Sequence, residues 1–246
     1  MRSTAATPVR FPVVPIAIGG AWLIALLAQA TGDAHLLHHH ALIEGGPPLW
    51  MAAPISLMAW QVMIAAMMLP ASLPAIRQFG LGAAVAARPN RSLAAFLAPY
   101  AGLWTIFGLL AFMGDVVLHH VVDATPWLAA HPWLIEAGVL ALAGTYQLTP
   151  LKRRNLEACR HPAGVAPAPQ GRRGSFELGL DHGLACLGSS GALMLLMFAE
   201  GFANLWWMVA LTAVMVYEAT GRFGQRAAVA VGVGLLVFSA GILITG

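Results

Sequence analysis

Residues 54–75 read PISLMAWQVMIAAMMLPASLPA, an uncharged stretch that ends two residues before Arg77. A helix rises about 1.5 Å per residue, so a stretch of this length covers the hydrocarbon core of a bilayer, which is roughly 30 Å thick. Soluble domains rarely contain an uncharged apolar stretch of this length. The stretch therefore predicts a membrane-spanning helix.

Six further apolar stretches have the same character. The composition agrees with them, because a chain that is 59% hydrophobic and 9% charged, with a mean hydropathy of +0.75, lies outside the range of soluble globular domains. Without an internal repeat or a separate soluble segment, residues 1–246 are expected to form a single integral membrane domain. We predict an all-α, polytopic transmembrane helical bundle with about seven spans, near 12–30, 54–75, 93–114, 132–150, 178–199, 203–218 and 227–245.

The Lys and Arg residues fall into four clusters that alternate with gaps free of both. Cytoplasmic loops of membrane proteins retain such cations, so the pattern predicts an inside N-terminus, an outside C-terminus and a bacterial inner membrane. The cations are spread over four loops without interleaved aromatic residues, which favours contact with membrane lipid and gives no indication of nucleic acid. The clusters are Arg2 and Arg10; Arg77, Arg88 and Arg91; Lys152, Arg153, Arg154, Arg160, Arg172 and Arg173; and Arg222 and Arg226.

Seven of the nine histidines lie in the segments assigned to the opposite side. Asp115 and His119 are four residues apart, so on a helix they share one face at the outer end of the third span. His131 precedes Pro132 at the start of the fourth span, and Glu136 follows about one turn later as a further ligand or as the partner that orients an imidazole. Two imidazoles and a carboxylate suit copper, zinc or iron. The alternative is that these are interfacial polar residues facing water.

A histidine-rich segment precedes the second span. His35, His38 and His39 have spacings that place two imidazoles on one helical face, and short histidine tracts are compositional signals for metal binding. A loop of this kind suits capture or delivery of a metal. A plain solvated loop is the alternative.

Thiol and imidazole groups are also found on the inner side. His182 and Cys186 lie four residues apart near the inner end of the fifth span, and Cys159 lies in the long inner connection 151–177, which its prolines and glycines predict to be irregular. The thiols are expected to stay free because the cytoplasm is reducing. Such ligands suit copper(I) or zinc. The spacing leaves open whether they converge, and each alone can be a packing residue.

Four stretches together resemble the DUF2182 family, described as predicted metal-binding integral membrane proteins and sometimes labelled copper chaperones. The resemblance covers roughly residues 55–220 and implies a membrane protein that handles copper. It carries over the family positions Cys159, His182, Cys186, Asn204 and the acidic Glu218. The stretches are WQVMIAAMMLP at 60–70, YQLTPLK at 146–152, LEACR at 156–160 and HGLACLG at 182–188.

The chain departs from that family where thiols are common. Asn155, Ser189 and Ser190 stand where members commonly carry cysteine, and Ala219 stands where a lysine usually follows the acidic residue. The inner soft-ligand site that the resemblance implies is therefore depleted here.

The spacing of Asp115, His119 and His131 is similar to the copper ligands in the C subunit of copper membrane monooxygenases. Three function hypotheses follow. The first is a metal-binding protein, with copper as the metal, that handles it for, or assembles with, a membrane or periplasmic partner in a multi-subunit complex. The second is a catalytic or accessory subunit of a copper-dependent membrane monooxygenase. The third is a metal-free structural subunit. Enzymatic activity is not assigned from the sequence.

Overall fold

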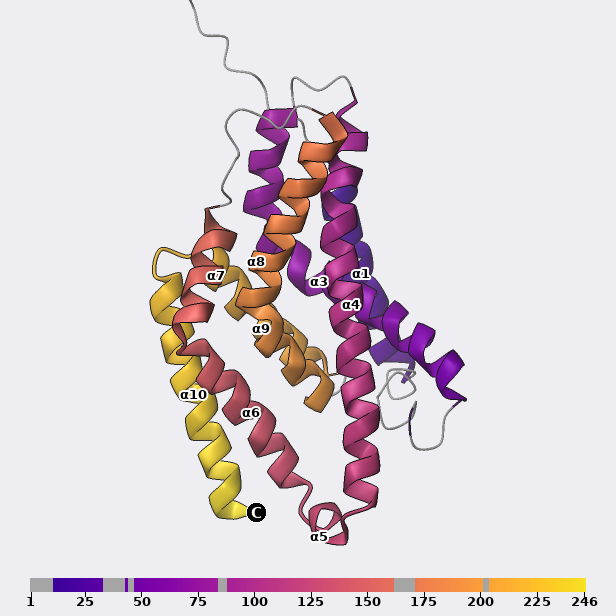
Figure 1. The fold of residues 1–246 in the computed structure, drawn as a ribbon, viewed down its shortest axis with the longest axis vertical. Coiled ribbons are helices and arrows are strands. Elements are labelled where there is room, and N and C mark those ends of the chain that lie inside the picture. The colour runs from indigo at the N-terminus through magenta and orange to yellow at the C-terminus, as the bar shows by residue number, and fades with distance from the viewer. Residues whose placement is uncertain (1–10, 33–42, 44–46, 84–87, 162–170, 201–203) are drawn as a thin grey trace, which may run out of the picture.

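Helices make up the secondary structure of the residues described by the computed structural model, which are 11–32, 43, 47–83, 88–161, 171–200 and 204–246, and this part of the chain contains no strand. The all-α prediction is confirmed. In chain order the helices are α1 (Val13–Thr31), α3 (Leu49–Ala83), α4 (Pro89–Asp123), α5 (Pro126–Ala129), α6 (Trp133–Gln147), α7 (Pro150–Arg160), α8 (Gly171–Glu200), α9 (Leu205–Thr220) and α10 (Gly224–Thr245) (Figure 1).

Five of the described helices are long and apolar enough to cross a bilayer: α1, α3, α4, residues Arg173–Met197 of α8, and α10. Their outward side chains are apolar, as lipid requires; Ile16, Leu110 and Val237 are 70%, 66% and 66% exposed. The chain is a multi-pass membrane protein. The helices α6 and α9 have 15 and 16 residues, short of a full crossing. The count of seven spans therefore stays a prediction.

Each predicted span overlaps a helix, although 132–150 runs past the end of α6 at Gln147. The connections differ from expectation. The prediction of an irregular inner connection at 151–177 is wrong for residues 151–160, which belong to α7, and for residues 171–177, which belong to α8. Residues 115–123, which lie between the predicted third and fourth spans, continue α4, because no residue between Asp115 and Asp123 breaks a helix. Residues 162–170 of the inner connection and the predicted loop histidines His35, His38 and His39 lie outside the described residues.

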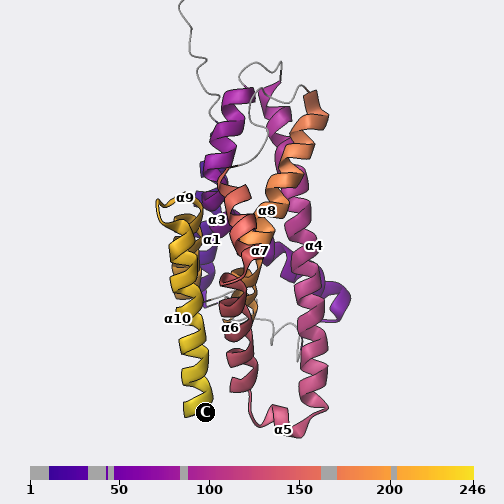
Figure 2. The same ribbon diagram turned by 60° about the vertical axis from the view of Figure 1, so that its left-hand side comes forward.

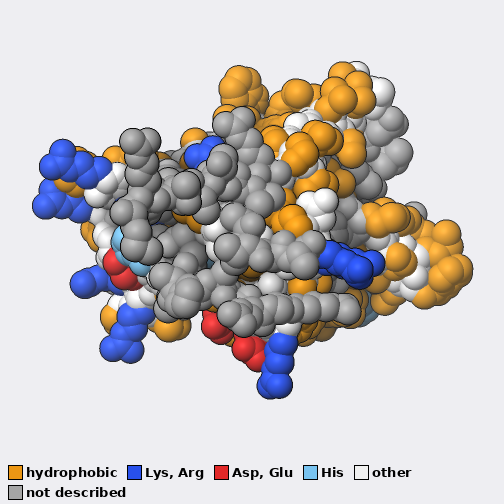
Figure 3. Space-filling model, turned by 90° about the horizontal axis from the view of Figure 1, so that it is seen from above, with side chains coloured by type: hydrophobic (Ala, Val, Ile, Leu, Met, Phe, Trp, Pro, Cys, Tyr) orange, Lys and Arg blue, Asp and Glu red, His pale blue; other side chains and the backbone are white. Residues whose placement is uncertain are grey.

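The long helices give the molecule two distinct ends. The end of α3, the start of α4 and the start of α8 lie together at the top of Figure 1, whereas the end of α4, α5 and the C-terminus lie at the bottom. Lys and Arg side chains gather around the top end, as the view from above shows (Figure 3). Along α4, Arg91 and Asp115 are separated by about 36 Å, since a helix rises about 1.5 Å per residue.

Two helix pairs are in close contact through glycine. In the α4–α8 pair, a Cβ at Gly179 would collide with the backbone oxygen of Phe96, and a Cβ at Gly183 would lie 3.3 Å from the Cα of Tyr100. Small residues four apart let helix backbones approach closely in membranes. The antiparallel helices α6 and α10 lie side by side in both ribbon views (Figures 1 and 2) and meet in the same way, through glycine. The α4–α8 contact sets the position of the site described next.

Candidate functional site

Two free thiols from different helices meet inside the protein. Cys159 on α7 and Cys186 on α8 are 6% and 1% exposed, and Cys186 lies close enough to Cys159 to be the largest influence on the pKa of that thiol. The sequence left their convergence open, and the structure brings them together. We call Cys159 and Cys186 the thiol pair. It lies in the main apolar core, which also contains buried methionines of α3, α8 and α9.

A short polar network extends from Cys186 toward the N-terminal end of α8. The thiol lies 3.5 Å from the Tyr100 hydroxyl and 4.0 Å from the Ser72 hydroxyl, and these two hydroxyls are 3.1 Å apart. The Nε2 atom of His182 lies 3.1 Å from the same Ser72 oxygen. Helices α3, α4 and α8 therefore each contribute one polar side chain to this network next to the thiol.

The His182 ring is tightly packed, but one of its two nitrogens makes no hydrogen bond within the described residues. Its ring stacks on Phe96 and Tyr100, with centroids 5.9 and 5.7 Å away, and the residue is 3% exposed. Its Nδ1 atom has no hydrogen-bond partner in the described part of the chain. A buried polar atom without a partner costs about 1–3 kcal/mol. An imidazole nitrogen that makes no hydrogen bond is a donor that a metal can use.

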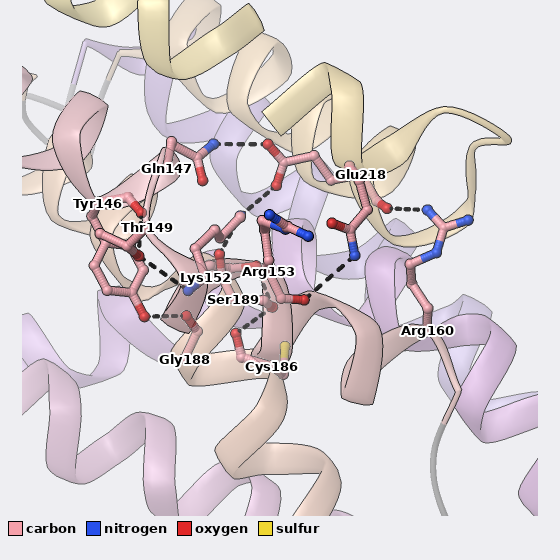
Figure 4. Close-up of polar contacts among 12 residues, drawn as sticks. Tyr146, Gln147, Thr149, Lys152, Arg153, Arg160, Cys186, Gly188, Ser189 and Glu218 are labelled. Atoms are coloured by element: carbon pink, nitrogen blue, oxygen red, sulfur yellow. Dashed lines mark hydrogen bonds and ion pairs between the residues drawn. The ribbon is translucent and has the colours of Figure 1, made fainter. Parts of the chain in front are cut away.

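A buried ion pair lies near the thiol pair. Lys152 of α7 and Glu218 of α9 are 0% and 1% exposed, with Nζ 2.6 Å from Oε2. The ammonium also donates to the backbone oxygen of Ser189, and Gln147 donates from Nε2 to Glu218 Oε1 at 2.7 Å (Figure 4). Buried charges persist when they are paired and hydrogen-bonded in this way. The pair joins α6, α7, α8 and α9 in one network.

The YQLTPLK stretch at 146–152 positions this lysine. Thr149 caps α7, because its hydroxyl accepts the backbone N–H of Lys152 at 3.1 Å, and Pro150 occupies the first helical turn, where it is favoured. The Tyr146 hydroxyl donates to the Gly188 oxygen at 2.5 Å and so ties α6 to α8. One face of α7 then buries Lys152, Leu156 and Cys159.

The electrostatics of α7 follow from this burial. The neighbouring Cys186 thiol and then burial raise the pKa of the Cys159 thiol well above its ordinary value. Burial lowers the pKa of Lys152, whereas Glu218 acts in the opposite direction. Each group also acts on the other, since the positive lysine favours the thiolate form of Cys159. A metal that replaces the thiol proton would find a cation already beside it.

The predicted outer residues are only partly brought together. The Asp115 carboxylate lies 3.4 Å from His119 Nδ1, and both side chains are about nine-tenths buried. His131 instead places its Nδ1 atom 2.6 Å from the Trp127 backbone oxygen, and Glu136 lies half-buried in the first turn of α6. Within the described ranges, no three His, Cys, Asp or Glu side chains are grouped so that they could hold a metal. The complete outer triad stays a prediction.

Sequence reasoning missed the residues whose partners are distant in the chain. Ser72, Tyr100 and Gln147 are common residue types in apolar helices, and only long-range packing reveals their contacts. The signal for Lys152 was present, because it ends a family stretch and stands three residues after its cap. Asn204, a family position, has a structural role: its side chain caps α9 by accepting the N–H of Trp207 at 3.3 Å.

An all-helical, multi-pass membrane protein with two buried thiols in contact has the donor atoms of a soft-metal-binding protein. The chain belongs to the PpoB2 family, described as copper chaperone, which residues 57–243 match. Its role is therefore the handling of copper, in agreement with the first hypothesis from the sequence. The matched range contains the thiol pair, His182 and the Lys152–Glu218 ion pair. Comparisons with curated proteins and with solved structures gave no match.

Proposed function

We propose that this protein binds copper(I) through Cys159 and Cys186 and transfers it to a protein partner at the membrane. The observation that carries the proposal is the meeting of the two thiols in a buried apolar core. Thiolate sulfur selects copper(I), and an apolar surrounding excludes water and competing hard ligands. His182, whose Nδ1 atom has no hydrogen-bond partner among the described residues, is the proposed additional donor after a local rearrangement, because the three side chains do not form a ready-made cluster in this structure.

Charge balance supports this assignment. Binding of one copper(I) ion to two thiols releases two protons and leaves a bis-thiolate complex with one net negative charge. The Lys152 ammonium lies beside the thiol pair and can offset that charge. Because the pKa of Cys159 is raised, its proton must be displaced at neutral pH, so copper(I) affinity should increase as pH rises. A lysine in this place also makes a bare divalent cation a poorer fit.

An outer half-site is part of the proposal. The Asp115–His119 pair supplies a carboxylate and an imidazole on the far side of the molecule, and His131, Glu136, His35, His38 and His39 are the proposed further ligands that receive or deliver the metal there. The close approach of Asp115 and His119 favours this role. Turnover of a substrate by oxygen at this site, absent from variants of Asp115, would instead support a monooxygenase subunit.

The test is a copper(I) titration of the purified protein against a chromophoric copper(I) chelator under reducing conditions. We expect one tightly bound copper(I) in the wild type and its loss in Cys159→Ser and in Cys186→Ser. The matched control is Asp115→Ala combined with His119→Ala, which should lower total metal but keep the tight copper(I) step. Both cysteine variants retaining that step, with unchanged affinity, would refute the assignment of the thiol pair.

A further inference from the structure

A cavity of arginine side chains lies where α7 ends and α10 begins. Its volume is about 380 Å³, and Arg160, Arg222 and Arg226 line it together with Phe223. None of these residues is used by the copper site. The guanidinium groups of Arg222 and Arg226 each lie 5.3 Å from the centroid of the Phe223 ring, so the aromatic ring holds both cations near each other.

The cavity carries a net positive charge, because its wall contains three arginines and one acidic residue. Glu157 is the acidic residue in its wall, and that carboxylate already accepts from Gln225 Nε2 at 3.0 Å and lies 3.5 Å from His161 Nε2. Among the described residues, no carboxylate pairs with Arg222 or Arg226. The first residues of α10 also line the cavity, and the N-terminal end of a long helix attracts anions.

Arg160 gives the cavity a rigid wall. Its Nη1 atom donates to the Glu218 backbone oxygen at 2.7 Å and its Nη2 atom donates to the Gly221 oxygen at 2.8 Å. Gly224 packs closely against this guanidinium, since a Cβ at that position would collide with Arg160 Nη1. The cation is therefore fixed in place before any ligand arrives, which lowers the entropic cost of binding an anion.

The surface that continues from the cavity is apolar. Along α10, Val229, Val233 and Val237 follow Arg226 on one helical face and are 46%, 49% and 66% exposed. A ligand that touches both regions needs an anionic head and a hydrocarbon tail. Charge complementarity and this continuity point to an anionic phospholipid from the bilayer that α10 crosses.

We propose that the arginine cavity, defined by Arg160, Arg222, Phe223 and Arg226, binds the phosphate headgroup of an anionic phospholipid whose acyl chains lie along Val229, Val233 and Val237. The site is separate from the thiol pair and does not depend on copper binding. Bidentate guanidinium–phosphate hydrogen bonds give the headgroup its specificity.

The test measures retention of phosphatidylglycerol by the purified full-length protein in native mass spectrometry, against phosphatidylcholine of the same chain length. We expect the wild type to prefer phosphatidylglycerol and Arg222→Gln combined with Arg226→Gln to bind it about 30-fold more weakly, because two direct guanidinium–phosphate contacts are lost. The matched control is Arg77→Gln combined with Arg91→Gln, which removes the same charge from exposed positions outside the cavity and should bind as the wild type does.

Three outcomes would overturn the proposal. The first is equal loss of phosphatidylglycerol in the two double variants, which would indicate a general surface-charge effect. The second is equal retention of the two lipids by the wild type. The third is full displacement of the lipid by glycerol 3-phosphate at equal concentration, which would assign the cavity to a free phosphate compound, because that competitor has the anion but no acyl chains.

Discussion

Lys152 is a charged side chain that the protein removes completely from solvent. Such a group is tolerated because Glu218 and the Ser189 oxygen satisfy it, and the same burial lowers its pKa. Breaking a buried ion pair leaves one uncompensated charge, which typically costs 3–5 kcal/mol, whereas replacing both partners by apolar groups is often neutral. The ion pair therefore has two roles: it stabilises the fold, and it places a positive charge beside the thiol pair. These two roles can be separated by mutation.

The separation uses Lys152→Met, Glu218→Leu and the combined variant. We expect each single substitution to destabilise the protein by about 3–5 kcal/mol, since it strands the other charge, and the combined variant to recover most of that loss. Thermal unfolding in detergent measures this. Copper(I) affinity should stay lower by roughly 10- to 100-fold in the combined variant, because the cation beside the bis-thiolate is still missing.

Two results would contradict this account. Additive losses of stability in the combined variant would mean that the two residues do not act as a pair. Full recovery of copper(I) affinity together with stability would limit Lys152 to a structural role and remove the charge-balance argument from the proposed site.

The helix α7 shows what the sequence could and could not predict. Long apolar runs fix their own secondary structure, so every predicted span overlaps a helix. The stretch 150–160 has five charged residues and lies between proline-containing segments, and so it resembles a loop by composition. Its helical signal consists of the Thr149 cap, Pro150 at the first turn, and the buried positions 152, 156 and 159. That periodicity can be interpreted only when α8 is known to pack against α7.

The candidate site was predictable to the same extent. Cys159, His182 and Cys186 were identified by residue type and by the family stretches that contain them, because thiols and imidazoles are ligands for soft metals. The proximity of these side chains could not be predicted, since it depends on the close contact between α4 and α8 and on the position of α7. The outer residues Asp115 and His119 meet because four-residue spacing on one helix is a local property, whereas their closure with His131 depends on how α4 and α6 are joined.

The α4–α8 contact gives a direct test at the level of helices. A Cβ at Gly179 would collide with the Phe96 backbone, which cannot give way as a flexible side chain can. We expect Gly179→Ala to destabilise the protein by about 1–3 kcal/mol through overpacking, measured by thermal unfolding in detergent. The matched control is Gly102→Ala on α4, where nothing lies within 4 Å; there alanine should be neutral or stabilise by about 0.5–1 kcal/mol. Equal shifts for the two variants would show that close backbone approach does not hold the pair.

At the scale of the whole molecule, the two proposed metal positions are far apart. Tyr100, beside the thiol pair, and Asp115 lie on the same helix, separated by about 22 Å along its axis. A metal that passes between them needs donors on the way. Met67, Met194 and Met197 are fully buried in the core that also holds the thiol pair, and thioethers are soft, weak ligands suited to passage.

Transfer of a metal between the two proposed positions requires that the two ends of α4 face opposite sides of the membrane, with the arginine end inside. Asn90 and Ala124 are exposed positions at those ends, and the two native thiols are buried. On intact cells, a membrane-impermeant thiol reagent should therefore label Ala124→Cys and leave Asn90→Cys and the wild type unlabelled, while lysed cells should label both variants. External labelling of Asn90→Cys, with Ala124→Cys protected, would show that the protein has the opposite orientation in the membrane. The thiol pair would then lie near the oxidising face, where a copper(I) thiolate site could not be kept reduced by cytoplasmic thiols.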